Sequence, residues 1–168
     1  MAGQISTIPA INIYKLSEKI RSNKEISNFI KMLFNRKAST QIQSSQNIRI
    51  SYFNNSQDAK NYLLGLNTKE WEALRFTPSQ YNAEHHEKYF SSASKTSHEV
   101  IGQEFDGVAI AMDQFFTYDI DGNLIYGGDA YYAATKMLFQ NITRARRRLD
   151  LVIINNSEIL NRCLAILK

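Results

Sequence analysis

The fold of this chain is decided by two apolar stretches, Val108-Ala109-Ile110-Ala111-Met112 and Leu151-Val152-Ile153-Ile154. No polar residue interrupts either stretch, and strands that are buried on both faces have this composition. Such strands belong to parallel sheets that are covered by helices on both sides. Shorter β-type runs occupy 11–14, 48–53 and 73–76, and segments of helical spacing alternate with them. The sequence therefore predicts an α/β domain with a mostly parallel sheet and helices on both of its faces.

Amphipathic spacing and turn residues predict the remaining elements. Apolar residues recur at i, i+3, i+4 and i+7 after Ser22 and Glu25, which stand in the capping-box spacing of a helix start. Three further helices are expected at about 59–66, 129–147 and 160–167. Asp121-Gly122 lies inside the β-type stretch 116–126 and predicts a β-hairpin excursion from the main sheet.

Length and composition favour one globular domain spanning 1–168. The chain has 168 residues, of which 43% are hydrophobic and 21% charged, as is ordinary for a globular protein. Its apolar runs are far shorter than the ~20 residues of a membrane span, and no apolar segment follows a basic start as in a secretory signal. The single cysteine forms no internal disulfide, which fits a reducing compartment. We therefore expect a cytoplasmic protein without a membrane partner, and the net charge of +4 does not by itself identify a nucleic-acid partner.

The most polar stretch is 80–97, in which His85 and His86 stand between Glu84 and Glu87. Adjacent side chains diverge on a helix or a strand, whereas a zinc site needs nitrogen and sulfur ligands that converge. We therefore expect this stretch to be a solvated loop without a metal. No Gly-Lys pair occurs in the sequence, so the chain has no phosphate-binding P-loop of its own.

Arginines gather at the end of the predicted helix 129–147, at positions 144, 146, 147 and 148. The negative end of the helix dipole accounts for Arg146 and Arg147. Arg144 falls on the inward side near Met137, where a guanidinium needs an anionic partner. That partner is either a protein carboxylate or a bound phosphate, and the spacing does not decide between them. Arg21 precedes a helix start, which favours anions, although a solvated or salt-bridged arginine also explains its position.

Three segments, in order along the chain, resemble conserved motifs of superfamily 1 helicases. The stretch 16–26, L-S-E-K-I-R-S-N-K-E-I, resembles the motif that opens the second motor domain of those proteins. The stretch 96–106, T-S-H-E-V-I-G-Q-E-F-D, resembles the motif that follows and runs into the predicted strand at 108–112. The stretch 138–146, L-F-Q-N-I-T-R-A-R, resembles the last motif and runs into the strand at 149–154. The resemblance implies a RecA-like three-layer domain, the second one of a UvrD-like DNA helicase, as part of a longer protein.

The resemblance also implies how this domain meets a nucleotide. In the family, ATP lies between two RecA-like domains, and the first of them supplies the P-loop and the acid that binds Mg²⁺. Arg21 and Arg144 would then contact the γ-phosphate as arginine fingers, which stabilise the charge that develops during phosphoryl transfer. Glu104 would accept a hydrogen bond from the ribose hydroxyl, and Gly102 would leave room for the nucleotide.

By the same resemblance, Thr96 and His98 would contact single-stranded DNA without sequence preference. The sequence departs from the family pattern at Ile101, where Lys or Gln is common, and at Ile20, where an aromatic residue is frequent. The interval of about 75 residues between the first two motifs has no room for the large inserted subdomain of the best-known members. The alternative is a degenerate, non-catalytic RecA-like module that binds DNA or a protein partner.

Overall fold

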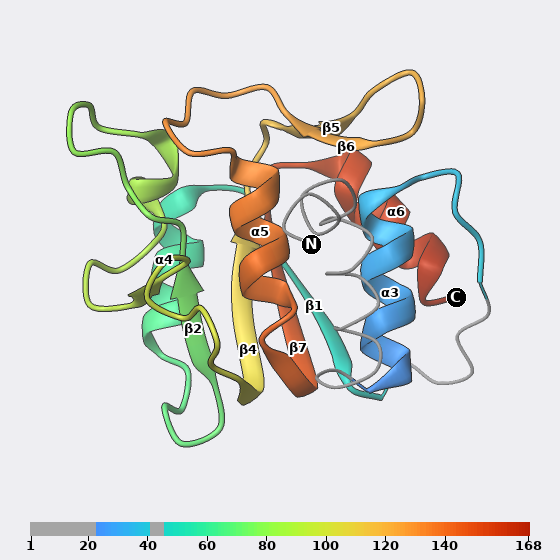
Figure 1. Cartoon of the computed structure of the whole chain (residues 1–168), viewed down its shortest axis with the longest axis horizontal. Helices are drawn as coiled ribbons and strands as arrows, with labels where there is room; N and C mark the ends of the chain where they lie inside the picture. Colours follow the sequence, from blue (N-terminus) through green and yellow to red (C-terminus); the bar gives the residue numbers. More distant parts are fainter. Residues whose placement is uncertain (1–22, 41–45) are drawn as a thin grey trace, which may run out of the picture.

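A five-stranded parallel sheet forms the centre of the molecule. The computed structural model describes residues 23–40 and 46–168, and the order of the strands across the sheet is β1-β7-β4-β2-β3 (Figure 1). Their bounds are Ile48–Phe53 (β1), Glu72–Arg75 (β2), Lys95–Thr96 (β3), Phe105–Met112 (β4) and Ala145–Ile154 (β7). Each strand pairs with its neighbours in parallel. The predicted α/β class with a parallel sheet is confirmed, and the arrangement is consistent with a RecA-like domain.

The two apolar stretches that predict the fold are the central strands β4 and β7. They pair with each other in parallel, with Val108 opposite Leu149 and Met112 opposite Ile153. All residues from Val108 to Met112 are fully buried. Because these strands have a neighbour on each edge and helices on each face, their apolar side chains have no contact with water, and their burial drives the assembly of the layers.

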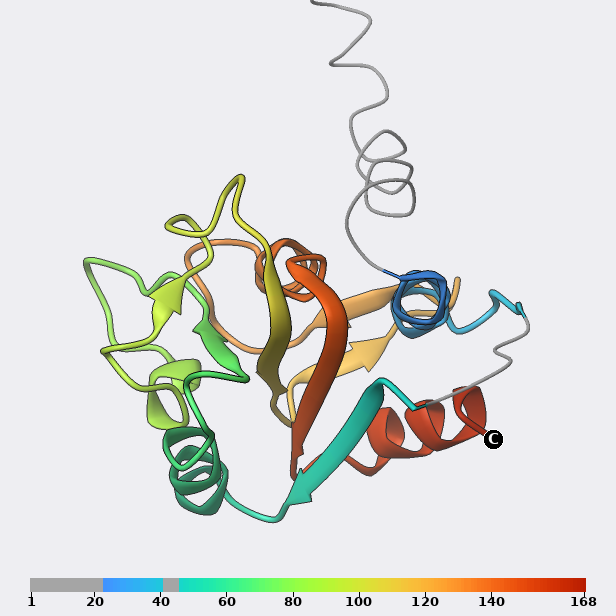
Figure 2. The ribbon, with the colours of Figure 1, turned by 90° about the horizontal axis from the view of Figure 1, so that it is seen from below.

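Helices flank the sheet on both faces and complete three layers. Their bounds are Lys24–Phe34 (α3), Ser56–Leu64 (α4), Ala134–Ile142 (α5) and Ser157–Ile166 (α6). Figure 2 shows α3 and α5 on one face of the sheet and α4 on the opposite face, while α6 contacts α3. No helix within 23–40 and 46–168 is long and apolar enough to cross a membrane.

Three of these helices begin at an asparagine cap, whose side-chain oxygen accepts the backbone N–H three residues on: Asn23, Asn55 and Asn156. The capping box expected from Ser22 and Glu25 does not involve Glu25. Its carboxylate accepts instead from the backbone N–H and the side-chain amide of Asn47, at 3.1 and 3.2 Å. Ser22 itself lies outside the described residues.

The predicted hairpin is confirmed as β5 (Phe116–Tyr118) and β6 (Leu124–Tyr126), which pair antiparallel outside the main sheet. The Asp119 side chain accepts the backbone N–H groups of Asp121 and Asn123, both at 2.9 Å, and closes the loop. Gly122 has a φ of +87°, a conformation that favours glycine.

The helix predicted at 129–147 is shorter than expected. It begins at Ala134 and ends at Ile142, and β7 begins at Ala145. The Thr143 hydroxyl donates to the carbonyl of Phe139 at 2.7 Å. Pairing of Ala145 with Phe105 then draws the arginines that follow into the sheet. Arg146, Arg147 and Arg148 therefore belong to a strand and not to a helix end.

The prediction of a solvated loop at 80–97 is wrong for its central residues. Glu84 and His86 are buried, and the short 3-10 helix η2 (His85–Lys88) packs near α4. The His86 Nε2 atom lies 3.0 Å from Glu84 Oε1. Burial is tolerated because these polar groups find hydrogen-bond partners within the fold, which the polar composition of the stretch did not indicate.

A buried carboxylate joins β7 to its neighbours. Asp150 is fully buried in β7, and its Oδ2 accepts from Arg49 Nη2 at 2.7 Å and from the Tyr62 hydroxyl at 2.5 Å. Its Oδ1 accepts from the Ser51 hydroxyl at 2.9 Å. Asp150 thus links β7 to β1 and to α4 on one face of the sheet.

Replacing Asp150 by alanine should lower the free energy of unfolding by about 2–4 kcal/mol, because the side chains of Arg49, Ser51 and Tyr62 lose their shared acceptor. The half-exposed Arg49 can still be hydrated, so the cost should stay below that of a fully buried pair. Urea denaturation followed by circular dichroism measures the change. Asp121→Ala, in the exposed hairpin loop, is the matched control and should stay within about 0.5 kcal/mol. Equal midpoints for the two variants would contradict the role given to Asp150.

Candidate functional site

Arg144 lies between the end of α5 at Ile142 and the start of β7 at Ala145. Figure 1 shows that α5 ends beside the starts of β4 and β7. Arg144 is only 8% exposed, and its Nη1 donates to the Gln103 carbonyl at 3.2 Å. Its Nη2 lies 3.4 Å from the Thr143 hydroxyl, and its own carbonyl accepts from the Phe105 N–H at 2.9 Å. The guanidinium therefore lies against the backbone that leads into β4. The predicted inward position of Arg144 is confirmed, although it follows α5 and is not within it.

Glu104 is next to this contact, between Gln103 and the start of β4. Its side chain is partly buried, and its Oε1 lies 3.7 Å from Arg146 Nη1. The structure therefore brings together two predicted site residues, Arg144 and Glu104, that are distant in the sequence. We call the set of Gln103, Glu104, Asp106, Arg144 and Arg146 the amino-edge cluster.

A β-bulge explains why two consecutive arginines face outward here. Phe105 pairs with Ala145 and Gly107 with Arg148, so β7 has one residue more than β4 between these pairs. Arg146 and Arg147 are the two residues of β7 that lie opposite the single residue Asp106 of β4, and both are exposed. Their role as counter-charges to a helix dipole is therefore wrong, because they face carboxylates across the strand pair.

The strongest of these ion pairs joins Arg146 to Asp106. Arg146 Nη2 lies 2.6 Å from Asp106 Oδ1, and Arg147 Nε lies 3.9 Å from the same oxygen. The hydrogen bond from Arg146 holds the pKa of Asp106 below its ordinary value, and it raises the pKa of Arg146. Asp106 thus stays ionised and keeps Arg146 engaged at the edge of the sheet.

Gly102 is exposed just before this cluster. Its φ is +80°, and a Cβ built on it would meet no atom within 4 Å. The backbone conformation therefore favours glycine here, and the space beside it is open.

Arg21 lies outside the described residues. The first described residue is Asn23, whose backbone N–H donates to the Arg146 carbonyl at 3.1 Å. Its side-chain amide donates to the Arg147 carbonyl at 3.1 Å. The start of α3 is therefore attached to the same end of β7 as the amino-edge cluster.

Thr96 and His98 lie away from this cluster, at the carboxyl end of β3. Thr96 is buried, its N–H donates to the Glu99 carboxylate at 2.8 Å, and its hydroxyl accepts from the Glu99 N–H at 3.3 Å. The hydrogen bonds from Thr96 lower the pKa of Glu99. Thr96 thus shapes the turn, whereas His98 is exposed and reaches the surface.

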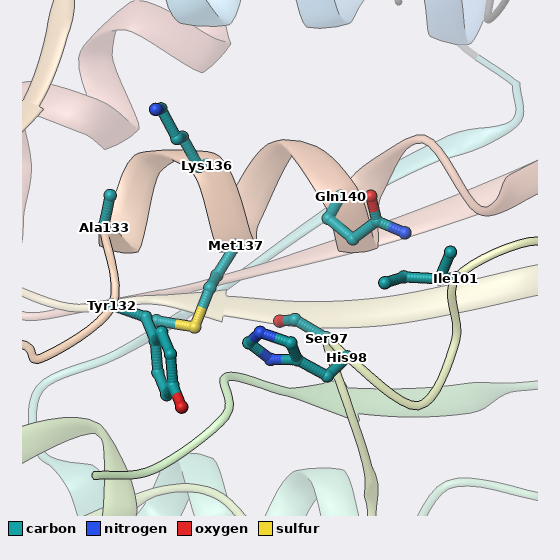
Figure 3. Close-up of a pocket in the computed structure, with 8 residues that line it drawn as sticks. All are labelled: Ser97, His98, Ile101, Tyr132, Ala133, Lys136, Met137 and Gln140. Carbon is teal, nitrogen blue, oxygen red and sulfur yellow. The ribbon is translucent and has the colours of Figure 1, made fainter.

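His98 lines an open groove between this turn and α5, with a volume of about 250 Å³. Figure 3 shows its ring next to Tyr132 and Met137, and its ring centroid is 4.7 Å from that of Tyr132. His98 Nδ1 lies 2.6 Å from the Thr77 hydroxyl, which orients the ring. The lining residues are Ser97, His98, Ile101, Tyr132, Ala133, Lys136, Met137 and Gln140.

Tyr132 and Lys136 line this groove, although no motif in the sequence points to them as site residues. The signal for Tyr132 was the pair Tyr131-Tyr132, two aromatic residues in a stretch outside the apolar runs. Within 23–40 and 46–168, no group of three or more His, Cys, Asp or Glu side chains could hold a metal ion.

Comparisons with known proteins add a single structural likeness. A scan against protein-family models found no match, and a search of the curated proteins found none. The chain is similar in structure to the C-terminal domain of a possible DNA helicase from Lactobacillus plantarum WCFS1, with a TM-score of 0.47 and 13% sequence identity. The match covers 90% of this chain and 95% of that chain.

Replacing Arg146 by alanine should raise the pKa of Asp106 back toward its ordinary value, because the main hydrogen bond that lowers it is lost. The pair favours the folded state above the ordinary pKa of Asp106, and that contribution disappears as the pH falls through the lowered value. A carboxyl-detected NMR titration of Asp106 measures the shift. Arg147→Ala, which removes a weaker partner, should raise the pKa less. The same Asp106 titration in wild type and Arg146→Ala would contradict the ion pair.

Proposed function

We propose that this chain is the second RecA-like domain of an ATP-dependent DNA helicase or translocase of superfamily 1 type. The observation that carries the proposal is the contact between the Arg144 guanidinium and the Gln103 carbonyl at 3.2 Å. It brings the residue that resembles the last helicase motif beside the residues that resemble the preceding one. Two motifs separated in sequence thus share one edge of the sheet, as a common ligand would require.

In this proposal the amino-edge cluster closes over ATP that is bound mainly by a P-loop domain elsewhere in the protein. Arg144, which the Gln103 carbonyl and the Thr143 hydroxyl hold in place, contacts the γ-phosphate together with Arg21. Both arginines stabilise the charge that develops as the phosphoryl group leaves. Glu104 accepts a hydrogen bond from the ribose, and the open space at Gly102 admits the nucleotide. The P-loop domain holds most of the ligands of Mg²⁺.

The second part of the proposal concerns single-stranded DNA, which would lie along the carboxyl end of β3. The exposed ring of His98 offers a stacking surface, and Thr96 positions it through the turn that it forms with Glu99. Thr96 itself would contact the sugar-phosphate backbone of the strand through its hydroxyl, which accepts from the Glu99 N–H and still has a proton to donate.

Arg144→Ala should lower the kcat for ATP hydrolysis by the full-length protein about 10³-fold or more, because a finger that stabilises the transition state is lost. Steady-state ATPase assays with single-stranded DNA present measure the effect. Arg147→Ala is the matched control, since its side chain is 74% exposed and its Nε lies 3.9 Å from the Asp106 carboxylate. It should keep the wild-type rate within a few-fold.

A wild-type rate in Arg144→Ala would reject the arginine-finger assignment and favour the degenerate, non-catalytic module that binds DNA or a protein partner. The purified 168-residue chain should not hydrolyse ATP, because its sequence holds no P-loop. Hydrolysis by this chain that Arg144→Ala abolishes would also reject the proposal.

A further inference from the structure

Four aromatic rings from three separate segments form a continuous series beside the groove. The ring centroids of Tyr81 and Tyr131 are 5.7 Å apart, those of Tyr131 and Tyr132 are 4.9 Å apart, and those of Tyr132 and His98 are 4.7 Å apart. We call these four residues the aromatic track. Tyr81 is 74% exposed and Tyr131 is 63% exposed. His98 is exposed as well, so three of the four rings present aromatic surface to solvent.

A buried carboxylate holds the two exposed rings together. Glu84 is 8% exposed, and it accepts the backbone N–H of Ser79 at 2.7 Å and that of Tyr131 at 2.5 Å. The Ser79 hydroxyl in turn accepts the N–H of Tyr81 at 3.0 Å. One buried acid thus ties the loop of Tyr81 to the loop of Tyr131. Burying a charge is costly, and here its hydrogen bonds order two rings that remain in water.

We propose that the aromatic track is a base-stacking surface for single-stranded nucleic acid that extends from His98 to Tyr131 and Tyr81. The inference deepens the proposed function and rests on its contact between His98 and the strand. Every base has a π face, so stacking on successive aromatic rings binds a strand without reading its sequence. The rings of Tyr131 and Tyr132 are perpendicular, at 90°, so successive bases would meet differently oriented ring faces.

The surroundings of the track favour nucleic acid over a protein partner. Lys136 stands on the rim of the groove in the first turn of α5 and supplies a cation for a backbone phosphate. Gln140, further along the same helix, supplies a hydrogen-bonding group. The rings contact one another in succession across three loops, whereas the core of a protein interface is a compact apolar patch. Ile101 adds one exposed aliphatic side chain at the groove.

The first test measures binding of a fluorescein-labelled oligothymidylate to the 168-residue chain by fluorescence anisotropy at low salt. Tyr131→Ala and Tyr81→Ala should each weaken binding at least about five-fold, because each removes a stacking surface for one base. Tyr131→Phe keeps the ring and should bind as wild type does. Tyr52→Ala is the matched control, since Tyr52 is 37% exposed on the edge strand β1 and lies outside the track.

The second test maps the contact directly and tolerates weak binding. An oligothymidylate that carries 5-iododeoxyuridine should crosslink on irradiation to the peptides of Tyr131–Tyr132 or of Tyr81, as located by mass spectrometry. Each carboxylate oxygen of Glu84 accepts one backbone N–H, and Glu84→Gln replaces one of these oxygens by an amide that cannot accept. This variant should therefore reduce crosslinking at Tyr81 and Tyr131. It should leave the His98 crosslink in place. Circular dichroism confirms that each variant is folded.

The outcomes separate the aromatic track from the proposed function. Wild-type binding that the tyrosine variants do not weaken, with crosslinks at His98 only, would overturn the track and leave the helicase proposal standing. No binding and no crosslink by wild type would overturn the track together with the proposed DNA contact, while the Arg144 assay still tests the ATP role. Self-association of the chain that Tyr131→Ala abolishes would assign the track to a contact between two copies and overturn its role in stacking.

Discussion

The parallel pairing of β4 with β7 is the constraint on which the rest of the structure depends. Its register, from Phe105 opposite Ala145 to Met112 opposite Ile153, brings the start of each strand to one edge of the sheet. The residues just ahead of the two strands, Glu104 and Arg144, therefore become neighbours although 40 positions separate them in the printed sequence. Asp150 makes this register specific, since a shift of β7 by one residue would turn its carboxylate away from Arg49 and Tyr62 to the opposite face of the sheet.

Helix α5 relates the two candidate sites to each other. Its first turn carries Lys136 at the groove, and its end leads through Thr143 to Arg144 at the amino-edge cluster. At 1.5 Å per residue, nine residues of helix span about 13 Å, which is the distance between the two ends of one rigid element. A ligand that displaced one end of α5 would therefore also move the residues at its other end. The two sites thus share one helix of the core, and the loops that complete each site lie at its two ends.

The sequence predicts the central layer well because its signal is local. Unbroken apolar runs identify β4 and β7, and Asp121-Gly122 identifies the hairpin, since each depends only on neighbours in the chain. The end of α5 was misplaced because arginines suit a helix end and a strand start equally, and pairing with Phe105 decides between them. The bulge that exposes both Arg146 and Arg147 arises from the pairing of β4 with β7. It therefore cannot be predicted from the sequence of either strand alone. The inward position of Arg144 was predictable although it lies two residues after Ile142, because its N–H still donates to the Asn141 carbonyl at 3.0 Å and the last turn of the helix thus continues to it.

The polar stretch around Glu84 shows why composition alone misjudges burial. Three carboxylates of this domain, Glu84, Asp113 and Asp150, are buried, and each accepts hydrogen bonds from N–H or O–H donors on other elements. Asp113 is held by the hydroxyls of Tyr89 and Tyr126, whose pKa values are raised by burial and by its charge. Asp113 thereby holds two tyrosines that pack in the core, and Asp150 holds side chains of β1 and α4 against β7. Glu84 instead holds the loops of Tyr81 and Tyr131, whose rings are exposed to solvent. Ordering these exposed rings buries no apolar surface and so adds no hydrophobic stabilisation to the core. The cost of burying Glu84 is explained if the ordered rings bind a ligand. A single strand of unpaired bases is the ligand that successive aromatic faces fit.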